Sequence, residues 1–226
     1  GHMRSLFVLA IIALGFAGSV VSRQAGLLTY VWFSLFRPME WMWMDLSSLR
    51  LSLVAGLLLL VPCLATFKFP NVTHPLNLLA WAFFGTVIAA QYTTYLKLDL
   101  DWVDQFARLL AVSTLMITLV KTREHLSQLV AVMAGSFAFF SVKAGFASLL
   151  GGGVQFAEGQ AGAFVDNNGY ALAVNMAMPM MAATAATLQA PLPGLDRWRK
   201  AFVFAIPLSV LTVIGTMSRA GLLALG

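Results

Sequence analysis

Residues 126–149 read LSQLVAVMAGSFAFFSVKAGFASL, an apolar run whose one ionisable side chain is Lys143. It exceeds the roughly 18–20 residues that an α-helix needs to cross the hydrocarbon core of a bilayer. The whole chain has 226 residues, of which 60% are hydrophobic and only 10% charged, whereas soluble domains carry about 25% charged residues. Further apolar runs lie at residues 5–21, 25–36, 51–67, 76–94, 103–120, 169–189 and 201–216, and another begins at residue 220.

These runs predict an all-α fold, a polytopic transmembrane helical bundle with about eight or nine spans. The run at 25–36 is the least secure span, because Arg37, Pro38 and Glu40 cut it short. We expect one transmembrane helical domain over residues 1–226, with Gly1-His2 as a tag remnant ahead of Met3. The chain stops as a new apolar run begins, so we expect it to be the front part of a longer protein.

The loop charges predict an orientation. With eight crossings, one set of loops holds seven basic residues and the other four, and the positive-inside rule places the first set in the cytoplasm. The first set holds Arg23, Lys68, Lys121, Arg123, Arg197, Arg199 and Lys200, and the second holds Arg4, Arg37, Arg50 and Lys97. Most of the acidic residues, among them Glu158 and Asp166, fall with the second set. The amino terminus, the loop at 150–168 and the turn at Ser218-Arg219 are then expected to face the side opposite the cytoplasm.

Three cations are predicted near that outer side. Arg108 and Lys143 lie five or six residues inside their spans, roughly 8–9 Å below the outer surface, and Arg219 lies at the outer turn. With no acid expected inside the spans to pair with them, they suggest a site for an anionic group such as a lipid-linked pyrophosphate. The alternative is that all three merely snorkel to the lipid phosphates.

The loop before the seventh run is rich in glycine and amides. It contains Gly151-Gly152-Gly153 and then Asp166-Asn167-Asn168-Gly169. Glycines allow a backbone to approach a ligand, and the amides could bind hydroxyls. The alternative is a turn followed by a helix cap. In either case we expect a helix to begin near Asn168, capped by Asp166 or Asn167.

Four stretches together resemble the O-antigen ligase and polymerase superfamily. Their order and separation look most like those of the exosortase-associated O-glycosylation ligases. The stretches are Val142-Lys143-Ala144-Gly145-Phe146, the triple glycine at 151–153, Phe164-Val165-Asp166-Asn167-Asn168-Gly169-Tyr170, and Thr216-Met217-Ser218-Arg219-Ala220-Gly221-Leu222.

The resemblance implies a multi-pass glycosyltransferase of the bacterial inner membrane. Such an enzyme transfers a glycan from an undecaprenyl-pyrophosphate carrier to lipid A–core or a protein hydroxyl at the periplasmic face, with inversion and without metal or cofactor. Membrane lipids are the other expected partners, and nucleic acid is not expected. Arg219 matches the family's essential arginine and is the expected catalytic residue. A second arginine and a histidine are implied downstream of Gly226. We expect Lys143, Arg108, Asp166, Asn167, Asn168 and Ser218 to bind substrate.

Other functions remain open at the level of sequence. A polymerase would use the same donor and differ only in its acceptor. A transporter of lipid-linked or anionic substrates would need broken helices that meet at the membrane midplane, and Pro179 and Pro207 hint at breaks. A non-enzymatic membrane scaffold is a third possibility. The single cysteine, Cys63, excludes a disulfide framework, and the histidines have no metal-ligand spacing.

Overall fold

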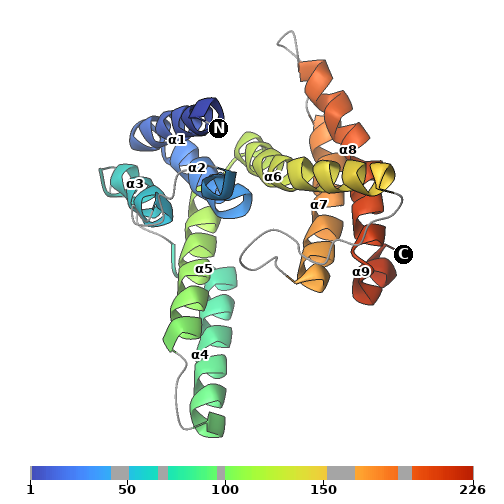
Figure 1. Cartoon of the computed structure of the whole chain (residues 1–226). Helices are drawn as coiled ribbons and strands as arrows, with labels where there is room; N and C mark the ends of the chain where they lie inside the picture. Colours follow the sequence, from blue (N-terminus) through green and yellow to red (C-terminus); the bar gives the residue numbers. More distant parts are fainter. Residues whose placement is uncertain are drawn as a thin grey trace.

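The computed structural model describes residues 2–41, 51–65, 71–95, 100–151, 166–187 and 195–225, and the regular elements in these ranges are all helices. The predicted all-α class is therefore confirmed (Figure 1). The helices are α1 (His2–Val21), α2 (Arg23–Phe36), the 3-10 helix η1 (Pro38–Trp41), α3 (Leu51–Ala65), α4 (Pro75–Tyr95), α5 (Leu100–Leu119), α6 (Arg123–Leu150), α7 (Asn167–Thr187), α8 (Leu195–Gly215) and α9 (Arg219–Ala224). Each predicted apolar run coincides with one α-helix to within a few residues.

Short polar side chains set several helix starts. The Ser22 hydroxyl accepts a hydrogen bond from the backbone N–H of Ala25 at 3.5 Å, and Thr122 accepts one from the N–H of His125 at 3.1 Å. Both residues are extended N-caps, which satisfy backbone donors that a helix start leaves free. At the other end of α2, Arg37 adopts a left-handed conformation with φ of 49° and ends the helix.

Two hydrophobic cores share helix α6. In the first core, Leu129 of α6 packs with residues of α2, α3 and α5, among them Leu27 and Leu59. In the second core, Ala134 and Phe137 of α6 pack with residues of α7 and α8. Figure 1 shows α6 lying between α2 on one side and α7 and α8 on the other. Helix α6 thus joins the two halves of the fold.

The contact between α6 and α8 is close and partly polar. A Cβ on Gly145 would overlap the backbone carbonyl group of Leu208, so the two backbones approach as only glycine permits. Beside it, the hydroxyls of Ser141 and Ser209 lie 2.8 Å apart, and Thr212 donates to the Ser141 carbonyl at 2.6 Å. Small residues with interhelical hydrogen bonds are typical of helix contacts inside membranes.

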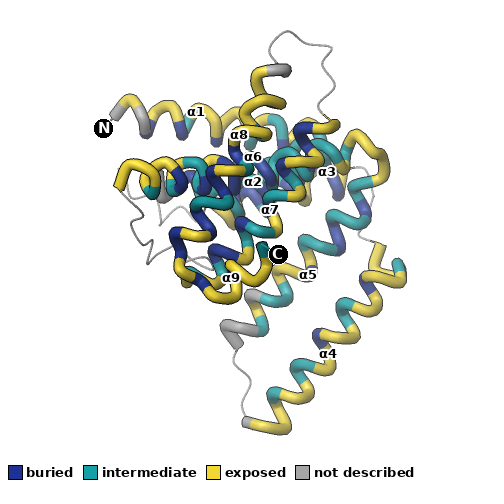
Figure 2. Tube along the Cα trace, turned by 90° about the vertical axis from the view of Figure 1, so that its right-hand side faces the viewer, coloured by how far each residue is buried: buried dark blue, intermediate teal, exposed yellow. Residues whose placement is uncertain are grey.

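Many large apolar side chains face outward. Helix α4 packs chiefly on α5 and is largely exposed along its length (Figure 2). Its Leu79 and Phe83 are more than half exposed. Soluble monomers rarely expose such extended apolar surface. Pro75–Thr94, Arg123–Leu150 and Arg197–Gly215 are long and apolar enough to cross a membrane, and Ser5–Val21, Leu51–Ala65 and Phe106–Leu119 are shorter apolar helices. These helices indicate a membrane protein. The full set of eight or nine spans stays a prediction.

Candidate functional site

The turn between α8 and α9 is built by the residues of the Thr-Met-Ser-Arg stretch. Thr216 is buried, its hydroxyl donates to the carbonyl of Val213 at 2.7 Å, and it lies 3.3 Å from the backbone N–H of Ser218. Met217 has φ of 53°, in the left-handed region that non-glycine residues seldom adopt. Ser218 then caps α9 by accepting from the N–H of Gly221 at 3.0 Å. The chain therefore reverses within three residues.

The start of α7 holds this turn in place. The Ser218 hydroxyl donates to the side-chain carbonyl of Asn168 at 2.7 Å, and the Asn167 amide donates to the carbonyl of Thr216 at 3.1 Å. Residues almost fifty positions apart are thus joined by two hydrogen bonds. Three of the predicted site residues, Asn167, Asn168 and Ser218, come together at one junction, which we call the α7–α9 junction.

Further along the same two helices, α9 lies directly against α7. A Cβ on Gly221 would lie 2.5 Å from the Cβ of Ala171, a separation too short for real side chains. Asn175 donates its side-chain amide to the carbonyl of Gly221 at 2.8 Å. Its other amide atom, Oδ1, is buried without a hydrogen-bond partner among the described residues. Sequence reasoning missed Asn175, although a polar residue inside a predicted span is itself a signal.

Arg219 is the first residue of α9 and its side chain is exposed. Within the described ranges, no hydrogen bond or ion pair engages its guanidinium group. In contrast to the exposed Arg219, its neighbours Thr216, Ser218 and Gly221 are all buried in the junction. Among the described residues the fold therefore uses those three for packing and leaves the Arg219 guanidinium uncommitted.

The predicted start of the seventh helix is confirmed. Helix α7 begins at Asn167, and Asp166 caps it by accepting from the N–H of Gly169 at 2.9 Å. This supports the helix-cap interpretation of the Asp-Asn-Asn-Gly stretch and adds the contacts to the α8–α9 turn described above. The rest of the glycine-rich loop, residues 152–165, lies outside the described residues, and so does its predicted periplasmic Glu158.

The other two predicted cations lie on different helices. Lys143 is exposed on α6, between Ser141 and Gly145 of the α6–α8 contact. Arg108 is on α5, which packs on α4 and α2, whereas α9 packs on α7 and α8. Arg108 borders a groove of about 330 Å³ with residues of α2 and α3. The structure therefore does not bring Arg108 to the α7–α9 junction.

The expectation that no acid would accompany the three cations is wrong for Arg108. Its guanidinium forms an ion pair with the carboxylate of Asp104, one helical turn earlier in α5. Residues four apart lie on the same face of a helix, so the pair follows from their spacing. Both side chains are more than half exposed, and such pairs contribute little to stability.

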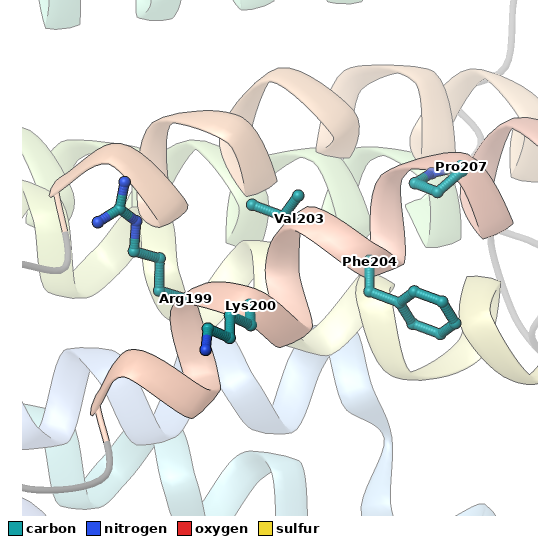
Figure 3. Close-up of a pocket in the computed structure, with 5 residues that line it drawn as sticks. All are labelled: Arg199, Lys200, Val203, Phe204 and Pro207. Carbon is teal, nitrogen blue, oxygen red and sulfur yellow. The ribbon is translucent and has the colours of Figure 1, made fainter.

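A separate hollow of about 510 Å³ lies along the outer face of α8. Figure 3 shows Arg199 and Lys200 at one end of it and Phe204 and Pro207 further along the same helix. Cations beside an apolar strip suit contact with a phospholipid at the membrane surface. This hollow shares no lining residue with the α7–α9 junction.

Among the described residues, no three His, Cys, Asp or Glu side chains are grouped so that they could hold a metal ion. His74 precedes α4, and His125 lies in the first turn of α6. Neither belongs to the α7–α9 junction, whose functional groups are amides, hydroxyls and one guanidinium. Such a set can bind phosphate and sugar hydroxyls, and the exposed carboxylate of Asp166, which caps α7 beside it, is a proton acceptor.

No curated protein and no solved structure matched the chain when it was compared with them. One family model matches residues 3–192, which include Arg108, Lys143 and the Asp166–Asn168 stretch but end before the Ser218-Arg219 turn. Because the match covers most of the chain, this protein belongs to DUF5935, a family of unknown function.

Proposed function

We propose that the chain is the membrane-embedded amino-terminal part of a glycan transferase of the O-antigen ligase type. It would transfer a glycan from an undecaprenyl-pyrophosphate carrier to lipid A–core or a protein hydroxyl at the periplasmic face of the bacterial inner membrane. The observation that carries the proposal is the exposed Arg219 beside Ser218, Asn167 and Asn168, which are linked across two helices. The sequence resemblance supplies the reaction.

The chemistry would be a displacement at the anomeric carbon. The acceptor hydroxyl attacks that carbon, the bond between carbon and the phosphate oxygen breaks, and the electron pair leaves with the lipid pyrophosphate. The guanidinium of Arg219 would pair with the phosphate oxygens and stabilise the charge that builds up on them. The hydroxyl proton needs a base, for which the resemblance implies a histidine downstream of Gly226. Free hydrogen-bonding capacity at Asn167 and Asn168 could orient sugar hydroxyls.

The proposal includes a polytopic topology of eight or nine crossings. In this arrangement Asp166 and Glu158 are periplasmic, and the basic start of α8 is cytoplasmic. Single cysteines at positions 158 and 198, in an otherwise cysteine-free full-length protein, can be tested with an impermeant thiol reagent on intact spheroplasts. We expect labelling at 158 and protection at 198. The opposite pattern would reverse the orientation and remove Arg219 from the periplasmic side.

The decisive test compares two substitutions of Arg219 in the full-length protein. Lysine keeps the charge but loses the planar fork that binds phosphate, so Arg219→Lys should be nearly as damaging as Arg219→Ala. Loss of one such electrostatic group typically costs about 10²–10³ in rate. Arg199→Lys, an exposed arginine of α8 outside the junction, is the matched control and should retain transfer.

Glycan transfer should be measured with lipid-linked donor and purified acceptor, after expression and membrane insertion of each variant are checked. A snorkelling arginine predicts the opposite result, because lysine snorkels equally well. Near-normal transfer by Arg219→Lys would therefore remove the pyrophosphate role. A product extended by repeated glycan units, with no transfer to lipid A–core or protein, would identify a polymerase that uses the same donor.

A transporter receives less support. Pro179 and Pro207, which suggested broken helices, lie inside continuous helices α7 and α8. Neighbouring helices and hydroxyl groups can satisfy the carbonyls that a proline frees. The hydroxyls of Ser209 and Thr212 donate to the carbonyls of Ala205 and Leu208, one turn back in α8, and not to that of Val203, which Pro207 frees. The two prolines therefore leave no unwound segment at which a transported substrate could bind.

A further inference from the structure

A polar pocket of about 310 Å³ lies where the start of α2, the end of α5 and the start of α6 meet. Figure 1 shows that α6 begins on the side of α2 and α5, away from α9. The pocket is lined by Ser22, Arg23, Gln24, Thr118, Leu119, Lys121 and His125. It shares none of these residues with the α7–α9 junction, and its size is at the small end of the range for ligand sites.

The lining of this pocket is cationic. Arg23 and Lys121 contribute two positive charges, and no carboxylate is among the lining residues. The acid nearest in sequence, Glu124, is exposed and accepts a hydrogen bond from the Gln128 amide at 3.3 Å. Helices α2 and α6 both begin at the pocket, so the positive ends of two helix dipoles add to the side-chain charges. An anion is the ligand that this electrostatic arrangement favours.

Two buried polar atoms at the pocket lack partners among the described residues. They are the side-chain carbonyl oxygen of Gln24 and Nδ1 of His125. The amide nitrogen of Gln24 is already committed, since it donates to the His125 carbonyl at 3.2 Å and to Gln128 at 3.4 Å. The free Gln24 oxygen can therefore only accept. Because buried polar groups are normally hydrogen-bonded, a ligand that offers a hydroxyl donor beside its anionic group would complete the site.

We propose that this pocket binds the phosphate group of a hydroxyl-bearing phosphate ester of the glycerophosphate type. Arg23 and Lys121 contact the phosphate oxygens, and the Gln24 oxygen accepts from the neighbouring hydroxyl. Two sources carry this chemistry: the headgroup of phosphatidylglycerol and soluble glycerol phosphate. The inference is independent of glycan transfer, because the pocket lies apart from Arg219 and on the side predicted to be cytoplasmic, where anionic lipids attract basic segments.

The test uses full-length protein in a neutral detergent and three ligands: phosphatidylglycerol, phosphatidylcholine and glycerol 3-phosphate. Binding is measured by native mass spectrometry for the lipids and by calorimetry for the soluble ester. The variants are Lys121→Gln and Arg23→Gln. Arg123→Gln is the matched control, because Arg123 is an exposed cation two residues from Lys121 that does not line the pocket. Thermal unfolding without ligand checks that each variant is folded.

We expect phosphatidylglycerol to bind more tightly than phosphatidylcholine, which has no free headgroup hydroxyl. Loss of a charge-assisted hydrogen bond to phosphate should weaken binding about tenfold or more in Lys121→Gln. Arg123→Gln should change it far less. Equal losses of binding in Lys121→Gln and Arg123→Gln would mean general attraction to a basic surface and would overturn the proposal. Binding of phosphatidylcholine as tight as that of phosphatidylglycerol would overturn it too. Tighter binding of glycerol 3-phosphate than of phosphatidylglycerol would support the site and identify the soluble ester as its ligand.

Discussion

The seating of α9 against α7 predicts a specific effect for Gly221→Ala. The new Cβ would lie 2.5 Å from the Cβ of Ala171, whereas ordinary contacts begin near 3.4 Å. Helix α9 must therefore move by about 1 Å or detach from α7. Overpacking of this kind costs about 1–3 kcal/mol, and detachment is the easier response because α9 is only six residues long.

This loss of stability should make the junction open more often, which amide hydrogen exchange can measure. A change of 1–3 kcal/mol in a local opening equilibrium corresponds to about 5- to 150-fold faster amide hydrogen exchange. The relevant amides are those of Gly221 and Leu222, which bond to the side chain and backbone of Ser218 at 3.0 and 2.9 Å. Exchange in the peptide that covers residues 216–224 can be followed by mass spectrometry in the full-length protein.

A second substitution tests whether the contact with Ala171 causes the effect. Ala171→Gly removes the atom that the new methyl group meets, so the Gly221→Ala/Ala171→Gly protein should recover slow exchange. Gly85→Ala is the control for the substitution type, because no described atom outside the backbone of its own helix lies within 4 Å of the position of its Cβ on α4. Wild-type exchange in Gly221→Ala, or a double variant that exchanges as fast as the single one, would refute this account of the junction.

Two further predictions concern the contact between α6 and α8. Gly145→Ala should destabilise the fold by about 1–3 kcal/mol, because its Cβ would press on the backbone of α8, whereas Gly135→Ala, with its nearest neighbour at 3.8 Å, should be almost neutral in thermal unfolding. Ser209→Ala should cost about 0.5–1.5 kcal/mol, and pairing it with Ser141→Ala should cost less than the sum of the single changes. Strict additivity would mean that the two hydroxyls do not interact.

Sequence reasoning predicted the helices well, because the features that produce a helix lie in its own stretch of sequence. A long apolar run excludes water from the backbone, and a short polar residue before it caps the first turn. The start of α7 at Asn167 with its Asp166 cap is one example. The ion pair of Arg108 with Asp104 was also readable, since it needs only a spacing of four residues on a helix.

The tertiary contacts could not be read in the same way. The hydrogen bonds from Asn175 to Gly221 and from Ser218 to Asn168 join residues 46 and 50 positions apart. No periodicity fixes which helix faces meet, because the apolar helices of a membrane protein show little contrast between their faces. The pocket beside Gln24 was missed for the same reason, since its lining comes from two stretches, 22–24 and 118–125, and Gln24 and His125 are 101 positions apart.

Two of the predicted cations, Arg108 and Arg219, differ in what an incoming anion would have to displace. An anion at Arg108 must compete with the Asp104 carboxylate, which already neutralises the guanidinium and would repel phosphate. At Arg219 no described side chain competes. Local contacts explain the identity of the residues around Arg219. Thr216 and Ser218 form hydrogen bonds that shape the turn, and Gly221 allows α7 to approach closely. Among the described residues Arg219 has no such contact. An exposed guanidinium on a turn braced by two hydrogen bonds to α7 is therefore better placed than that of Arg108 to hold an external phosphate.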